Sequence, residues 1–112
     1  MAEKVVLEKA ITNAIVAWLK ANGYTFVLKT HGAAFQAAGL PDIVTIGWGG
    51  RFVGLEVKRP YVGRLTLLQD KMLRLINRCG GYGVVVCSVA DAEDAMLRVQ
   101  RGEQAKEVDF LV

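Results

Sequence analysis

Apolar residues recur along this chain at two different spacings, which predict where helices and strands form. Helical spacing, with one apolar residue every three or four positions, runs through residues 3 to 21, 66 to 79 and 91 to 100. Short runs of branched and aromatic residues are typical of strands and cover residues 24 to 30, 42 to 46, 51 to 59 and 82 to 89. The small residues of the stretch 31 to 40 predict a loop.

The predicted order of elements is therefore αβββαβα, which indicates an α/β fold. We expect the first three strands to form an antiparallel meander. The third and fourth strands, separated by a helix, are expected to pair in parallel through a crossover connection. The result is a mixed β-sheet flanked by helices. A chain of 112 residues has room for one hydrophobic core, so residues 1 to 112 are expected to form a single domain.

The turn between the second and third predicted strands decides which charged side chains meet. A three-residue turn at residues 48 to 50 places Asp42 directly opposite Glu56. A two-residue turn would instead pair Asp42 with Leu55 and send one carboxylate to the other face of the sheet. We expect the three-residue turn. Lys58 lies two positions after Glu56 and therefore shares its face.

Two opposed carboxylates repel each other unless positive charge lies between them. A hard divalent cation such as Mg²⁺ or Mn²⁺ would supply that charge, because both ions prefer oxygen ligands and bind through one or two carboxylates together with substrate phosphate. The alternative is a purely structural ion-pair cluster of Asp42, Glu56 and Lys58. The spacing by itself leaves both interpretations open.

Charge and composition narrow the class of protein. Residues 51 to 78 carry seven basic side chains against two acidic ones, within a chain whose net charge is only +3. Such a basic segment favours a polyanionic partner, although a solvated face gives the same count. No apolar run approaches the length of a membrane span, and early charges argue against a secretory signal. We expect a cytoplasmic protein with Cys79 and Cys87 as buried, reduced thiols.

The residues around these acids resemble a known nuclease signature. Residues 39 to 42 read Gly-Leu-Pro-Asp, and Glu56-Val57-Lys58 follows after the hairpin. This arrangement resembles the PD-(D/E)xK nucleases and, with Glu8 in the first helix, their VRR-NUC branch. The resemblance covers roughly residues 5 to 100. It implies a restriction-endonuclease-like αβββαβα fold, here as one stand-alone nuclease domain.

The resemblance also implies roles for individual residues. Asp42, Glu56 and the main-chain carbonyl of Val57 would hold Mg²⁺ or Mn²⁺, and Glu8 would complete the metal site. Lys58 would position or activate the attacking water. Gln69, at the start of the next helix, would contact the active site.

Two of these assignments have local alternatives. Glu8 lies at the edge of the apolar stripe of its helix, but a solvated glutamate near a helix N-terminus is equally ordinary. Thr66 and Gln69 form a capping-box pattern, in which the glutamine bonds back to the Thr66 backbone. The only histidine, His31, is interpreted as an ordinary loop residue, with a phosphate or water contact as the alternative.

The remaining basic residues of the segment are candidates for contacts to DNA phosphates, with a solvated surface as the alternative. They are Arg59, Arg64, Lys71, Arg74 and Arg78.

The predicted function is a metal-dependent DNA endonuclease of a bacterial or phage-infected cell. A chain this small offers little surface for reading bases, which favours recognition of DNA shape. Related small nucleases of this fold resolve four-way junctions, so the resemblance implies a homodimer acting on branched DNA such as Holliday junctions. The tail, residues 103 to 112, is a candidate for dimer packing. Alternatives are a catalytically degenerate DNA-binding protein of the same fold, a nuclease for flap, linear or single-stranded DNA, and a structural α/β module.

Overall fold

Helices and strands follow one another along the computed structural model in the order that the sequence predicts. The structure describes residues 2 to 31 and 38 to 106. Its elements are α1 (Ala2–Ala21), β1 (Val27–Lys29), β2 (Ile43–Ile46), the 3₁₀ turn η1 (Trp48–Gly50), β3 (Phe52–Val57), α2 (Leu67–Arg78), β4 (Tyr82–Val86) and α3 (Val89–Gln100).

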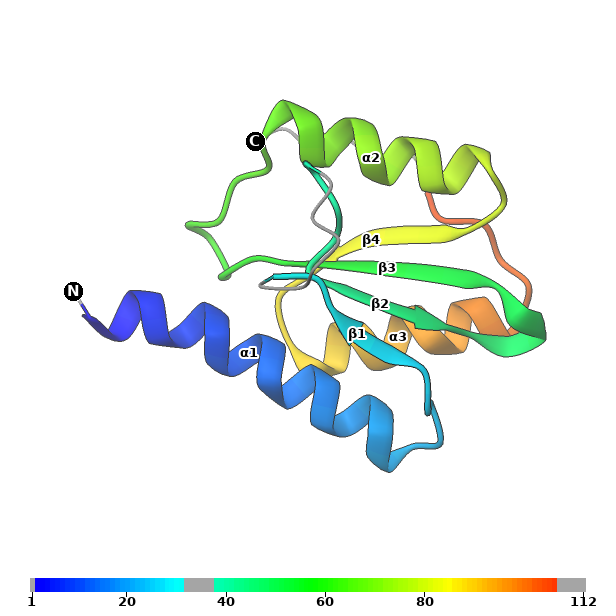
Figure 1. Ribbon diagram of the computed structural model, residues 1–112, viewed down its shortest axis with the longest axis horizontal. Helices are drawn as coiled ribbons and strands as arrows, with labels where there is room; N and C mark the ends of the chain where they lie inside the picture. Colours follow the sequence, from blue (N-terminus) through cyan, green and yellow to red (C-terminus); the bar gives the residue numbers. More distant parts are fainter. Residues whose placement is uncertain (1, 32–37, 107–112) are drawn as a thin grey trace.

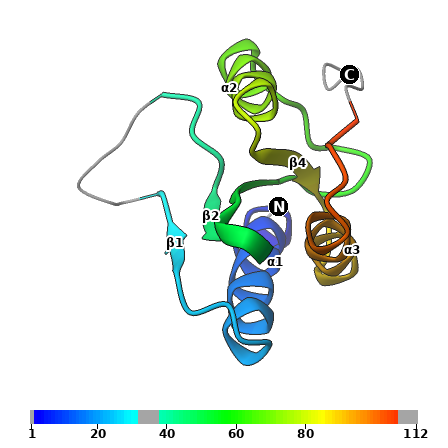
Figure 2. The same cartoon turned by 90° about the vertical axis from the view of Figure 1, so that its right-hand side faces the viewer.

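The four strands form one mixed sheet in the order β1-β2-β3-β4. The pairs β1–β2 and β2–β3 are antiparallel, whereas β3 and β4 run parallel. Helix α2 covers one face of the sheet, and α1 and α3 lie side by side on the other (Figure 1; Figure 2). The expectation of an α/β fold with a mixed sheet flanked by helices is therefore confirmed.

The larger part of the core lies between the sheet and the α1–α3 layer. Ile15 and Leu19 of α1 are fully buried there, against Val53 and Leu55 of β3. Their burial follows the helical spacing of α1 and the alternation of β3, as expected for elements that each turn one apolar face inward. None of the described helices is long and apolar enough to cross a membrane.

The β2–β3 hairpin has the predicted register. Ile43 lies opposite Leu55, so the preceding residue, Asp42, reaches the level of Glu56. The turn is closed by a hydrogen bond from Gly47 N–H to the carbonyl of Arg51, at 2.7 Å. Both Gly49 and Gly50 have positive φ, a conformation that glycine adopts without the steric cost of a Cβ atom. The three-residue turn is therefore confirmed.

Helix α2 packs on the sheet through a face that does not include Cys79. Leu73 and Ile76 face the sheet, while Leu75 is half exposed and Cys79 is exposed. The side chain of Asn77 helps to hold this face on the sheet, because it bonds both the N–H and the C=O of Gly83 in β4, at 2.7 and 3.1 Å. The expectation that Cys79 is a buried thiol is wrong for this reason.

Candidate active site

Two buried carboxylates meet where the β2–β3 ladder ends. Asp42 comes directly before β2, and Glu56 is the penultimate residue of β3. Asp42 Oδ2 accepts a hydrogen bond from the N–H of Val57, at 2.8 Å. This bond replaces a backbone bond at the end of the ladder and holds the Asp42 carboxylate against β3. Asp42 is 6% exposed and Glu56 is 1% exposed, so both acids lie out of bulk water.

The Glu56 carboxylate is only partly satisfied. Its Oε2 accepts a hydrogen bond from Gln69 Nε2 at 3.1 Å and lies 3.5 Å from Lys58 Nζ. Its Oε1 is buried and has no hydrogen-bond partner among the residues that the structure describes. A buried carboxylate oxygen left unpaired is costly, and it marks a position where a ligand or ion would be favourable.

Burial changes the protonation of Glu56. The pKa of Glu56 is raised from 4.5 to about 8, mainly by loss of hydration and in addition by the nearby Asp42 charge. The Lys58 ammonium lowers the pKa of Glu56, but by less than the other effects raise it. At neutral pH the two acids together therefore hold a proton in the absence of another cation.

Lys58 is held next to Glu56 by the sheet. Its backbone N–H donates to the carbonyl of Val86 in β4, at 3.0 Å, which extends the parallel ladder one residue past β3. Its side chain is mostly buried, so the ammonium stays close to the carboxylate.

Gln69 makes both the capping contacts and a contact to Glu56. Its Oε1 accepts from the N–H of Thr66 at 2.9 Å, and Thr66 Oγ1 accepts from the N–H of Gln69 at 3.1 Å, which is a complete capping box. Its Nε2 meanwhile donates to Glu56. The cap fixes the amide so that its NH₂ group points at the acid.

The carbonyl of Val57 faces the same side as Asp42. The N–H and C=O of one strand residue lie on the same edge, and the Val57 N–H bonds to Asp42. The bond from Lys58 N–H to β4 lies on the opposite edge. The Val57 carbonyl therefore lies on the edge from which Asp42 approaches β3.

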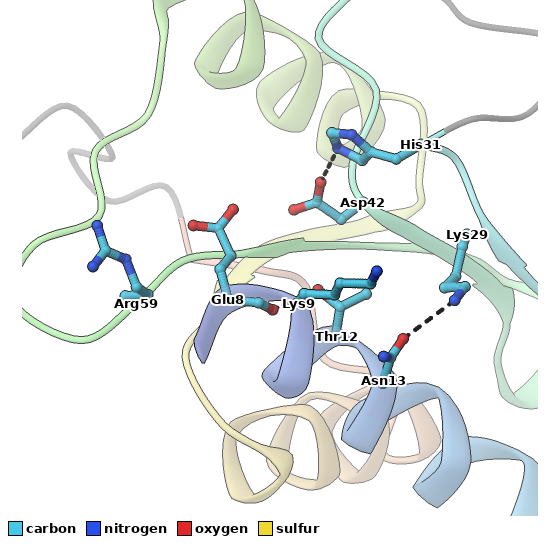
Figure 3. A pocket seen from close by; sticks show the side chains of 8 residues that line it. All are labelled: Glu8, Lys9, Thr12, Asn13, Lys29, His31, Asp42 and Arg59. Carbon is cyan, nitrogen blue, oxygen red and sulfur yellow. Dashed lines mark hydrogen bonds and ion pairs between the residues drawn. The ribbon is translucent and has the colours of Figure 1, made fainter. Parts of the chain in front are cut away.

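A cavity of about 510 Å³ opens beside Asp42, between α1 and the edge of the sheet (Figure 3). Glu8 projects into it from α1, as the resemblance implies, and Arg59 lines it at the end of β3 (Figure 3). The other lining residues are Lys9, Thr12, Asn13, Lys29 and His31. The cavity thus brings acidic and basic side chains together within reach of one ligand.

His31 is the site residue that the sequence interpretation underrates. Its Nε2 contacts Asp42 Oδ1, although the imidazole itself is 78% exposed (Figure 3). The sequence indicates this contact only when the register between β1 and β2 is known. Lys29 then lies opposite Ile43, which brings His31 to the level of the residues just before β2.

The basic residues of the segment 51 to 78 differ in their exposure and in their contacts. Arg74 pairs with the buried Asp70 one turn earlier in α2, with Nε 3.2 Å from Oδ1, and so takes part in local structure. Arg64, Lys71 and Arg78 are exposed. Arg51, also counted in the basic segment, bonds the carbonyls of Gly80, Gly81 and Glu103 and stacks over Tyr82.

The donor set fits a hard divalent cation. In the described part of the chain no three His, Cys, Asp or Glu side chains converge on one point, so the protein ligands would be two carboxylates and the Val57 carbonyl. That is the usual number for Mg²⁺, which keeps several waters. The unpaired Glu56 Oε1 and the proton retained by the acids are what a cation would satisfy and displace.

No protein-family model matches the chain, and no curated protein or solved structure matches it either. The functional interpretation therefore depends on the geometry of this site and on the motif resemblance.

Proposed function

We propose that the protein is a metal-dependent endonuclease of restriction-endonuclease-like fold that hydrolyses phosphodiester bonds in DNA. The observation that carries this proposal is the unpaired Oε1 of Glu56, buried opposite Asp42 and next to Lys58. An arrangement of this kind is unfavourable as a resting structure and becomes favourable when it binds a cation and a phosphate.

Asp42, Glu56 and the Val57 carbonyl would hold Mg²⁺ or Mn²⁺, and Glu8 faces the same cavity from α1. A bound ion of this type polarises a phosphate and lowers the pKa of its water. The side chains around the ion would supply the remaining chemistry. Lys58 presents an ammonium that orients the attacking water and stabilises negative charge on the phosphate. Gln69 keeps the Glu56 carboxylate in place through the helix cap.

DNA would approach along the cavity. Arg59 lines it and would contact a backbone phosphate, and the exposed Arg64, Lys71 and Arg78 would extend the basic surface over α2. Arg74 is already paired with Asp70, so we expect it to contribute less to DNA binding than Lys71 and Arg78.

The proposed working unit is a homodimer that nicks branched DNA such as Holliday junctions, in the cytoplasm of a bacterial or phage-infected cell. Exposed apolar residues on α2, Leu67, Leu68 and Leu75, support an interface. A twofold dimer would present two sites to a symmetric branch. Residues 107 to 112, which include most of the tail proposed for dimer packing, lie outside the described residues.

A structural ion-pair cluster is the competing interpretation, and the 3.5 Å approach of Lys58 to Glu56 favours it. A polar network kept for stability is normally fully paired. The unpaired Glu56 Oε1 argues against that interpretation.

A cleavage assay tests the proposal. Labelled four-way junction, flap, single-stranded and linear duplex DNA are incubated with Mg²⁺, Mn²⁺ or EDTA. We expect cutting only with a metal, and fastest on the junction. Glu56→Gln and Lys58→Ala should bind DNA and reduce cutting at least 100-fold, on the scale of lost active-site groups.

Glu93→Gln removes an exposed acid of α3 and serves as the control that should cut like the wild type. Cutting by Glu56→Gln at the wild-type rate would contradict the site assignment. Equal cutting of junction and linear duplex would contradict only the proposed branch selectivity.

A further inference from the structure

The loop after β3, residues 59 to 64, contains an unusual backbone conformation. Tyr61 has φ = 68°, and among the described residues no other non-glycine residue has positive φ. The N–H of Val62 donates to the carbonyl of Pro60, at 2.8 Å, which closes a three-residue γ-turn around Tyr61. A γ-turn with positive φ at its centre is rare and strained, more so for a side chain as large as tyrosine.

No internal packing offsets this strain. Tyr61 is fully exposed, and the neighbouring Val62 is half exposed. Glycine at position 61 would adopt the same backbone with less strain and without exposing an aromatic ring. A strained residue whose side chain makes no packing contribution to the fold is a reason to look for a function of that side chain.

The base of the loop is held firmly against the proposed catalytic strand. The N–H of Gly63 donates to the carbonyl of Arg59, at 3.0 Å. A Cβ atom on Gly63 would lie only 2.6 Å from Lys58 Cβ, so the end of the loop packs directly against Lys58. The position of Tyr61 is therefore tied to that of Lys58.

The surroundings of the tip are those of a nucleic-acid contact. Arg59, at one end of the loop, lines the cavity beside Asp42, and Arg64 lies at the other end. The loop projects between the beginnings of α1 and α2 (Figure 1). An exposed aromatic ring close to Arg59 presents a stacking surface beside a group that can bind a phosphate.

We propose that Tyr61 stacks on a nucleobase of the DNA strand whose phosphate occupies the cavity. This inference rests on the proposed function, since it needs DNA at that site. A base inside a regular duplex has no free face, whereas a base at a branch point or in a single strand offers one. The stacking surface therefore selects branched and single-stranded DNA over linear duplex.

The experiment measures stacking directly in the full chain. Junction, single-stranded and duplex DNA carry one 2-aminopurine, whose fluorescence falls when an aromatic ring stacks on it, and the label is moved along the strand. Binding is measured in EDTA, so that no DNA is cut. The variants are Tyr61→Phe, which keeps the ring, Tyr61→Gly, which relieves the backbone, and Tyr61→Asn, a second ring-free variant that tolerates positive φ.

We expect quenching at one label position near the branch with wild type and Tyr61→Phe, and none there with the ring-free variants. Those variants should bind junction and single-stranded DNA about tenfold more weakly and duplex within about twofold of wild type, the scale of one stacked base. Trp48→Ala removes an exposed aromatic at the opposite end of the β2–β3 hairpin and should change neither signal.

The outcomes separate the two proposals. Unchanged quenching in Tyr61→Gly and Tyr61→Asn would overturn the stacking inference, and so would an equal loss of affinity for duplex and junction DNA. Metal-dependent cutting by the wild type would in either case leave the nuclease proposal intact. Quenching that depends on Tyr61, with no metal-dependent cutting by wild type, would reject the nuclease and retain the stacking contact. The melting temperature of Tyr61→Gly, expected to be no lower than that of wild type, shows that the backbone keeps its fold.

Discussion

At the scale of single residues, burial, hydrogen bonding and charge act together on the side chain of Glu56. Its carboxylate is enclosed by the sheet and α2, accepts one amide hydrogen bond, and faces both a carboxylate and an ammonium. Its pKa is raised to about 8, with desolvation as the largest cause, so the folded protein holds a proton that the unfolded chain has lost by neutral pH. Stability is therefore linked to pH through this residue, and the proposed metal binding would be linked to pH in the same way.

The free energy of unfolding is expected to fall as pH rises. The pKa of Glu56 is higher in the folded state, so its contribution is complete below the unfolded value near 4.5 and is lost as pH rises through about 8. The loss is on the order of 3–5 kcal/mol. Urea denaturation of wild type and Glu56→Gln from pH 5 to 8.5 measures it, and the variant should show a much flatter profile.

Added Mg²⁺ provides a second comparison at pH 8. It should stabilise wild type, because an ion bound only by the folded state adds to its stability, and should have little effect on Glu56→Gln. Parallel pH profiles for the two proteins would show that Glu56 titrates normally, contrary to the expected effect of its burial.

At the scale of elements, the start of α2 connects the fold to the candidate site. The Thr66–Gln69 capping box ends the loop after β3, and the same glutamine reaches across to Glu56. Gly39 allows the chain before β2 to pack closely on the start of α2, because a Cβ at this position would lie 2.7 Å from the Leu68 carbonyl oxygen. The Gly-Leu-Pro-Asp segment before β2 and the start of α2 are thus packed against each other.

Two substitutions in the cap should differ in their consequences. Thr66→Ala removes only the cap and should cost about 1 kcal/mol of stability. Gln69→Ala also removes a partner of a buried carboxylate and should cost about 2–3 kcal/mol. Chemical denaturation gives both values. Proposed DNA cutting should fall in Gln69→Ala and remain near wild type in Thr66→Ala; equal effects on cutting would leave Gln69 with a capping role alone.

At the scale of the whole molecule, charge and apolar surface are distributed unevenly. The basic side chains that extend from the cavity toward α2 lie next to exposed leucines of the same helix. By contrast α3 presents acidic residues, with Asp94 paired to Arg98. We therefore expect the proposed DNA to meet the protein on the side of the cavity and α2, and the proposed dimer to use the exposed leucines of α2.

The proposed dimer is tested by light scattering at increasing protein concentration. We expect a mass near twice that of the chain, and a return to monomer in Leu68→Glu and Leu75→Glu, because a buried charge opposes association. Leu97→Glu changes an exposed leucine of α3 and is the matched control. A monomeric wild type would contradict the dimer. Dissociation by Leu97→Glu alone would move the interface to α3.

The sequence by itself determined the order of elements, the strand pairing and the meeting of Asp42 with Glu56. Hydrophobic spacing and turn chemistry are local, and a three-residue turn is enough to set the register of a hairpin. Only the tertiary structure decided which face of α2 is buried, the contact of His31 with Asp42, and the exposed, strained position of Tyr61. These depend on how separate elements dock: Asn77 ties α2 to β4, and the pairing of β1 with β2 brings His31 to the level of Asp42.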